Sequence, residues 1–323
     1  MKACPLSGGA RAAVLLLVFL SGCAPAGPVP PGGPVGGSDP RALQWCGMLA
    51  LPDETPDGDA LGGLSALTFD DERDLLYLLS DRGTLHHARL HGASDGAIER
   101  LELLESYPLV DRDGQRLKGA RADSESMALI EEAGERALLI GFERHHRLQR
   151  FSLEGRALTA PSVPEALEGA ACNGSLEGLT HHPRRGVIAG LEYASQGMDE
   201  RHSRLFDLDG VRFRWRRAHP NSGLTDFAPL GEGLLMLERD FRIGRPLTIT
   251  LSRAEFRDEE GERGDNGVLA GEVIARLASD EGWRLDNFEG LTRLGDGRYL
   301  MVSDDNFSLL QRSLLACFRL PAP

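Results

Sequence analysis

Carboxylates recur at one point of a pattern that this 323-residue chain repeats five times. Each copy has an apolar strand, a turn, a second apolar strand and then an acidic residue, and the copies start at Gly62, Glu125, Glu177, Ser222 and Glu289. Aligned on their apolar step, they make these residues equivalent: Leu64, Met127, Leu179, Leu224 and Leu291. The same alignment brings together the closing acids Asp81, Glu143, Glu192, Glu238 and Asp304. A repeat places equivalent residues at equivalent positions of one architecture, so it predicts a ring of five carboxylates.

Further charged residues flank this ring. Glu125, Glu177 and Glu289 begin their copies, and an arginine directly follows three of the ring acids, at Arg82, Arg144 and Arg239. Like charges a few ångströms apart raise one another's pKa, so a divalent cation is expected between them. Oxygen ligands favour Ca²⁺, with Mg²⁺ second. The predicted ligands are Asp81, Glu125, Glu143, Glu192, Glu238 and Asp304. The alternative is that the acids form structural ion pairs with the arginines.

Acids, a cation and arginines together can bind and polarise an ester. The guanidinium groups of Arg82, Arg144 and Arg239 match the oxygens of a phosphate or carboxylate, so they are the predicted contacts to a small anionic or ester substrate. A bound cation would lower the pKa of a water molecule, and Glu177 or Glu289 could accept its proton. His145 is a third candidate acid or base, because it follows Glu143 and Arg144 directly.

The elements that must hold these residues are short strands. Two more strand-like stretches follow the first copy, at 84–92 and 97–107, and four short strands per module are typical of a propeller blade. We therefore expect an all-β fold, a β-propeller of five four-stranded blades. The stretch 43–51 should supply the outer strand that the last module lacks, so that the N- and C-terminal strands close the ring. Six blades are the alternative if the spacer 240–290 holds a further blade. In a propeller both ends of the repeated pattern meet at the channel mouth.

The first forty residues are predicted to lie outside this fold. Lys2 and Arg11 flank the apolar stretch 12–20, which is too short for a permanent transmembrane helix, and the following "LSGC" is typical of a lipobox. Residues 1–22 are thus a predicted lipoprotein signal peptide, Cys23 the lipidated residue and 23–40 a Pro/Gly-rich tether, with the domain at 41–323. The alternative is an ordinary signal peptide. Ala24 favours a periplasm-facing outer-membrane location, with membrane contact through the anchor only.

Composition limits the partners. Asp and Glu number 49 against 36 Lys and Arg, for a formal net charge of −13, which argues against nucleic-acid binding. Nothing in the sequence indicates an oligomeric state. Cys46 and Cys317 lie in apolar segments near the two ends, which become neighbours if the ends close a ring. They form either a disulfide or two buried thiols.

The repeated motifs resemble those of the phytase-like family, described as having esterase-like activity of phytase. They are "EGLT" at the strand starts and "SDRG", "FERH", "LERDF" and "SDDNF" at the strand ends. The resemblance covers nearly all of the chain after about residue 60. It implies an exported bacterial propeller, here a lipoprotein member, that hydrolyses phosphate or other esters. The "DDPAIW"-type motif of β-propeller phytases is missing, which argues against true phytase activity.

The predicted function is therefore that of an exported hydrolase of phosphoesters or carboxyl esters, with a metal-dependent acidic site. The alternatives are a non-catalytic propeller that binds a ligand or protein in the cell envelope, and a structural module whose mouth is plugged. Fold alone cannot distinguish these, because propellers host many functions.

Overall fold

The computed structural model describes residues 26–33, 43–132, 134–171, 174–195, 197, 199–210, 212–256 and 267–320. Within these ranges, no helix is long and apolar enough to cross a membrane. The predicted signal peptide and the lipidation site at Cys23 lie outside the described residues. Most of the predicted tether, 23–40, does so as well.

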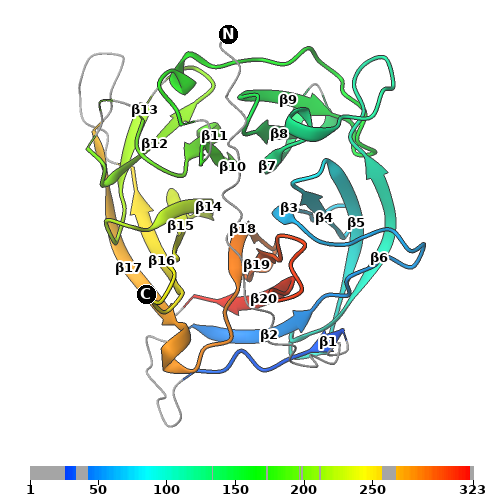
Figure 1. Ribbon diagram of the computed structural model, residues 1–323, viewed down its shortest axis with the longest axis vertical. Coiled ribbons are helices and arrows are strands. Elements are labelled where there is room, and N and C mark those ends of the chain that lie inside the picture. Colours follow the sequence, from blue (N-terminus) through cyan, green and yellow to red (C-terminus); the bar gives the residue numbers. More distant parts are fainter. Residues whose placement is uncertain are drawn as a thin grey trace, which may run out of the picture.

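The described chain is all-β, and its strands fall into five groups of consecutive strands (Figure 1). The first group contains β3 (Leu64–Asp70), β4 (Leu75–Ser80), β5 (Thr84–Gly92) and β6 (Ile98–Pro108). The second contains β7 (Ser124–Glu132), β8 (Glu135–Phe142) and β9 (Arg147–Phe151). The third contains β10 (Leu176–His182), β11 (Gly186–Leu191), β12 (His202–Asp207) and β13 (Arg212–Arg216).

The last two groups complete the arrangement. The fourth contains β14 (Gly223–Leu230), β15 (Gly233–Asp240), β16 (Thr248–Glu255) and β17 (Val268–Ala278). The fifth contains β18 (Asn287–Arg293), β19 (Tyr299–Asp304) and β20 (Leu314–Arg319), extended by β2 (Gln44–Ala50) and β1 (Gly27–Pro28). Three short 3-10 helices connect strands: η1 (Gly119–Arg121), η2 (Glu165–Leu167) and η3 (Ser279–Glu281). Pairing is antiparallel within each group, and the parallel pair β13–β17 joins the third group to the fourth.

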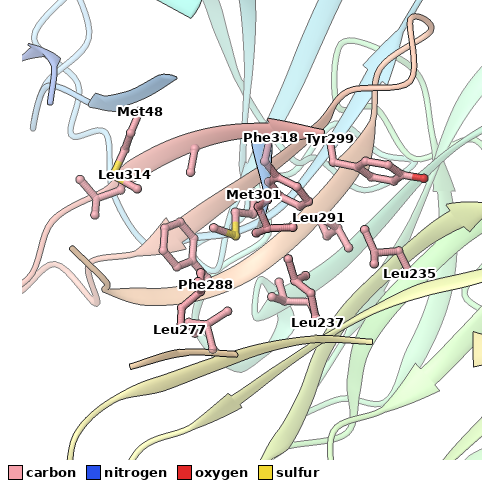
Figure 2. Close-up of a cluster of buried hydrophobic side chains, with 14 of the residues drawn as sticks. Met48, Leu235, Leu237, Leu277, Phe288, Leu291, Tyr299, Met301, Leu314 and Phe318 are labelled. Atoms are coloured by element: carbon pink, nitrogen blue, oxygen red, sulfur yellow. The ribbon is translucent and has the colours of Figure 1, made fainter. Parts of the chain in front are cut away.

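The first strands of the five groups form the inner wall. β3 contacts β7, β7 contacts β10, β10 contacts β14, β14 contacts β18, and β18 contacts β3 again, so these strands close a ring around the centre (Figure 1). Apolar side chains fill the space between neighbouring groups. In one such cluster Leu237 of β15, Leu291 of β18 and Met301 of β19 are buried against one another (Figure 2). The fold is therefore β-propeller-like.

Segments from the two ends of the propeller-like domain meet in the fifth group, because β2 pairs with β20 there. A disulfide joins Cys46 to Cys317 across this pair, with 5.0 Å between the two Cα atoms. Residues near the two ends thus close the ring together, and the disulfide joins them covalently.

Among the described residues, the second group has three strands and not the predicted four; the outer edge of β9 is instead covered by a loop, where Leu148 and Ser162 form an isolated bridge. In the spacer 240–290, the described residues form β16, β17, η3 and the start of β18, within the fourth and fifth groups.

A β-bulge interrupts each inner strand near its start and sets the register of the site. The residues that the bulges leave unpaired are Ser65, Glu125, Glu177, Thr225 and Glu289. Counting from the bulge, Leu67 and Phe227 are equivalent to Met127, Leu179 and Leu291. The alignment that used Leu64 and Leu224 was therefore three residues early in the first and fourth copies. Leu64 and Leu224 are also buried apolar residues, so residue type alone does not distinguish them from the equivalent positions.

Candidate active site

A cavity of about 860 Å³ lies where the inner strands begin and the second strands end. Most of the predicted site residues line it: Asp81, Glu125, Glu143, Arg144, Glu177, Glu192, Arg239, Glu289 and Asp304. This cavity, called the mouth below, also contains polar residues that the sequence did not single out: Asp123, Asp286, Asn287, Asn306, Ser308 and Gln311. The repeat therefore brings its two ends together at one place.

The ring of five carboxylates is wrong at one position. In each group, one residue of the second strand pairs with the residue just before the bulge, and the residue that follows it in the chain takes the ring position. This position holds Asp81, Glu143, Glu192 or Asp304 in four groups, but it holds Arg239 in the fourth group. Glu238 is fully buried one residue earlier. Its carboxylate accepts hydrogen bonds from Trp215 Nε1 at 2.8 Å and from the Ala218 N–H at 2.9 Å, so it holds the chain between β13 and β14 in place. The ring thus contains four acids and one arginine.

The bulged residues divide into two kinds. Glu125, Glu177 and Glu289 line the mouth, whereas Ser65 and Thr225 bond to the next inner strand. The Ser65 hydroxyl donates to the carbonyl oxygen of Ser124 at 2.7 Å, and that of Thr225 donates to the carbonyl oxygen of Phe288 at 3.2 Å. The mouth is therefore asymmetric, since only three of five groups supply a carboxylate at this level.

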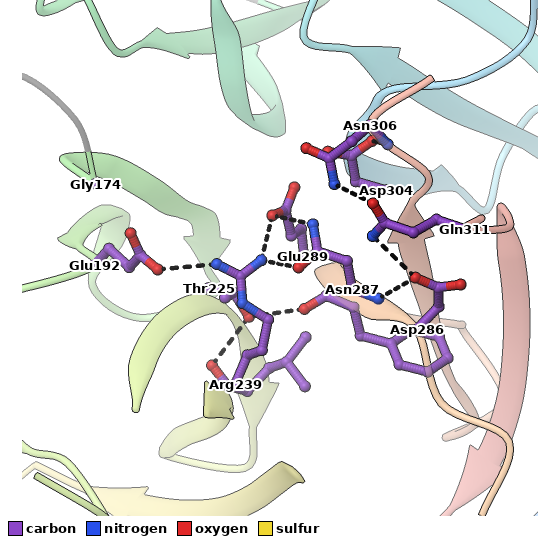
Figure 3. Close-up of polar contacts among 12 residues, drawn as sticks. Gly174, Glu192, Thr225, Arg239, Asp286, Asn287, Glu289, Asp304, Asn306 and Gln311 are labelled. Carbon is purple, nitrogen blue, oxygen red and sulfur yellow. Dashed lines mark hydrogen bonds and ion pairs between the residues drawn. The ribbon is translucent and has the colours of Figure 1, made fainter. Parts of the chain in front are cut away.

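One side of the mouth has its own positive charge. We call Glu192, Arg239, Asn287 and Glu289 the paired side (Figure 3). The Arg239 guanidinium lies 2.5 Å from Glu289 Oε1 and 3.2 Å from Glu192 Oε1, and it also donates to Asn287. Burial lowers the pKa of Arg239, but the carboxylates more than offset this, so the net shift is upward. Burial raises the pKa of Glu192 to about 7 although Arg239 opposes the rise.

The other side is acidic with little compensation. We call Asp123, Glu125, Glu143 and Glu177 the acidic side. Burial, reinforced by neighbouring carboxylates, raises the pKa of Glu125 and of Glu177 well above the ordinary value. Among the described residues, one ion pair forms on this side, between Asp123 and Arg144 at 2.9 Å, and the Arg144 side chain is 52% exposed. A backbone N–H, that of Gly174, donates to Glu143.

The acidic side fits a hard divalent cation. One oxygen each from Asp123, Glu125 and Glu143 lie within 4.8 Å of one another, about twice the usual Ca²⁺–oxygen distance of 2.3–2.6 Å. All three donors are carboxylates, the ligand type that such ions prefer. Asp81 Oδ1, elsewhere on the mouth, is buried and has no hydrogen-bond partner among the described residues. These residues could therefore hold a metal ion.

Two further predicted residues lie elsewhere. The Arg82 guanidinium packs over the Phe307 ring, 3.3 Å from its centroid, and is not among the residues that line the mouth. His145 lines a separate cavity of about 920 Å³ beside η1, β9 and η2, which shares Arg144 with the mouth. Arg82 and His145 therefore do not join the carboxylates.

Signals in the sequence could have found some of the missed residues. Asp123 lies two positions before Glu125, and Asn287 two before Glu289, so strand alternation places each pair on one face. The copies that begin at Glu125 and Glu289 do not include these preceding positions.

Together the fold and the mouth define a propeller-like protein with a carboxylate-lined cavity. A model of the phytase-like family, described as esterase-like activity of phytase, matches residues 59–307, so the chain belongs to this family. No curated protein matches the chain. A solved structure titled "glucose dehydrogenase" is 16% identical with a TM-score of 0.37, and the match covers 79% of this chain and 81% of that one.

Proposed function

We propose that this chain is an exported, lipid-anchored hydrolase of phosphoesters or carboxyl esters, built as a five-bladed propeller with a Ca²⁺-dependent site at the mouth. The observation that carries the proposal is the acidic side, where three carboxylate oxygens converge without an equal positive charge. Family membership supports an esterase-like activity. The predicted signal peptide, lipobox and tether in residues 1–40 support export and an outer-membrane location that faces the periplasm.

Asp123, Glu125 and Glu143 would hold the ion, which would supply Lewis acidity toward the ester and lower the pKa of a nearby water. Of the three predicted arginines, Arg144 is the best placed to bind the substrate. Its side chain is 52% exposed, whereas Arg239 is engaged by Glu192, Glu289 and Asn287. The guanidinium fork of Arg144 would bind the oxygens of the ester.

Glu177 is the stronger candidate for the base. Glu289 already accepts hydrogen bonds from Arg239 and Asn287, so its carboxylate is occupied. In hydrolysis the oxygen of water bonds to the acyl carbon or the phosphorus, and the bond to the ester oxygen breaks. The proton from water would pass to Glu177 and then to the departing alcohol oxygen, so the overall reaction consumes one water molecule.

The test is hydrolysis of p-nitrophenyl phosphate and p-nitrophenyl acetate by the purified protein, with Ca²⁺ and with a chelator. We expect turnover with Ca²⁺ only. Glu177→Gln should lower kcat at least a hundredfold. The matched control is Glu99→Gln, which changes the same charge on the exposed face of β6 and should leave kcat unaltered. Turnover by Glu177→Gln at the wild-type rate would exclude Glu177 as the base.

A second candidate is a propeller that binds a ligand without turning it over. The occupation of Arg239 by structural contacts, together with the packing of Arg82 on Phe307, favours it because fewer groups remain for chemistry. Absence of turnover with both esters, while Ca²⁺ still raises the melting temperature, would support this candidate over the hydrolase.

A further inference from the structure

Apolar side chains are exposed to solvent on one side of the mouth. Phe241 is 64% exposed and Leu310 is 92% exposed, yet both line the same cavity as the carboxylates. Leu247 and Leu285 line it too, and these two also pack against the buried core between the fourth and fifth groups. We call these four residues the apolar wall. Leucine and phenylalanine that remain exposed at a cavity mark a site for an apolar ligand.

The wall lies on the fourth and fifth groups, beside the paired side. Phe241 and Leu247 lie in the connection from β15 to β16, and Leu310 lies in the connection from β19 to β20. Leu285 lies just before β18, which begins at Asn287. Because β14 contacts β18, these connections are neighbours at one end of the ring. The mouth thus has an acidic side on the second and third groups and an apolar wall opposite.

The backbone that presents Leu310 is held in place. Asp305 Oδ1 accepts the N–H groups of Gly63 at 2.8 Å and Phe307 at 2.9 Å. Asp286 accepts the Arg312 N–H at 2.8 Å farther along the same connection. Asn306 and Phe307 also have φ values of 50° and 49°, a conformation that costs energy for residues other than glycine. Such strain persists where surrounding contacts impose it, and it is concentrated at functional sites.

Charge restricts what can bind next to this wall. Of the residues that the structure describes, nine with carboxyl groups line the mouth, but only two arginines do, Arg144 and Arg239. A ligand with many phosphates would be repelled even with one divalent cation bound. An ester with a single polar group and an apolar chain would meet attraction at both ends. The cavity of about 860 Å³ is within the usual range for small-molecule sites.

We propose that the apolar wall binds the alkyl, aryl or acyl group of an ester whose polar end lies at the acidic side, so the substrates are amphiphilic monoesters rather than polyphosphates. This inference rests on the proposed function and narrows its substrate class. Each methylene that leaves water for the wall should strengthen binding roughly fourfold.

Binding and turnover are measured separately so that each claim can fail alone. Binding of hexylphosphonate and of methylphosphonate to the Ca²⁺-loaded protein is measured by calorimetry, and kcat/KM is measured for p-nitrophenyl hexanoate and acetate. We expect hexylphosphonate to bind at least tenfold more tightly. The double variant Phe241→Ser/Leu310→Ser should lose most of that gain while binding methylphosphonate as before. The matched control is Leu309→Ser, because Leu309 is fully exposed beside Leu310 but is not a lining residue.

The outcomes separate the two proposals. Equal affinity for the two phosphonates, or an unchanged preference in the double variant, would overturn the apolar wall. A chain-length preference that the double variant loses would support the wall even if neither ester is turned over, and in that case the hydrolase proposal alone falls. Turnover of inositol hexakisphosphate faster than of the hexanoate would also overturn the wall.

Discussion

The two sides of the mouth contain similar carboxylates but differ in how much of the negative charge is balanced by positive groups. On the paired side, Arg239 reaches Glu192 and Glu289, which come from other groups of strands, so negative charge is neutralised within the protein. On the acidic side, Glu125 and Glu177 have strongly raised pKa values and no such partner among the contacts of the described residues. One arginine, Arg239, therefore separates a structural ion network from a candidate metal site.

The largest expected effect comes from removing that arginine. Arg239→Met leaves Glu192 and Glu289 buried without their partner, which should lower the free energy of unfolding by about 3–5 kcal/mol. Urea unfolding measures this. Arg144→Met is the control on the acidic side and should cost less than about 1 kcal/mol, because Arg144 is half exposed. Equal losses in both variants would show that Arg239 and Arg144 contribute equally to stability, so that the two sides do not differ in how their charge is balanced.

Calcium should act on the acidic side alone. At a hundred times its Kd, Ca²⁺ should raise the free energy of unfolding by about 2.7 kcal/mol, and a chelator should remove this gain. Glu125→Gln should abolish the gain, whereas Glu99→Gln should retain it. Differential scanning calorimetry with and without Ca²⁺ is the measurement. A gain that survives in Glu125→Gln would place the ion elsewhere.

Acid should destabilise the protein through a group outside the mouth. His86 is fully buried, contacts Ser106 Oγ through Nδ1 at 2.8 Å, and burial lowers its pKa to about 4. The unfolded chain binds a proton near pH 6.5 and the folded chain does not, so this contribution is present above pH 6.5 and is lost as the pH falls toward 4.

The size of the His86 effect should be about 2 kcal/mol between pH 7 and pH 4.5. Urea midpoints measured across this range should fall less in His86→Gln than in the wild type. Glu177→Gln should keep the wild-type contribution of His86, because the two residues belong to different groups of strands. An unchanged acid loss in His86→Gln would show that another group is responsible.

The smallest effect is the sharpest test, because one substitution should act in opposite directions on the two sides. Without divalent ions, Glu177→Gln should stabilise the protein by about 1 kcal/mol, since it removes a carboxylate from a crowded acidic site. Glu289→Gln should destabilise it by about 1 kcal/mol, since it weakens the partner of Arg239. Thermal melts in chelator compare the two variants. The same sign in both would remove the distinction between the sides.

Much of this arrangement was predictable because strand patterns are local. Alternating apolar residues predict the strands. The repeat places Asp81, Glu143 and Asp304 at the same point of their copies, and all three line one cavity. The error at Glu238 also has a local cause. An acid and an arginine are adjacent there, and the alignment chose the acid, whereas the pairing across the bulge places Arg239 at the ring position.

The sequence by itself determined the all-β pattern, the closure of the ring by the segments around Cys46 and Cys317, and the gathering of acids at one end. Those features depend on the periodicity and order of residues along the chain. Only the tertiary structure decided which acids are neutralised, because Arg239 contacts Glu192 and Glu289 about fifty residues away. It also decided that Arg82 packs on Phe307 and that Phe241 and Leu310 line the mouth. Contacts between groups follow from how the groups close around a common centre, which no local pattern records.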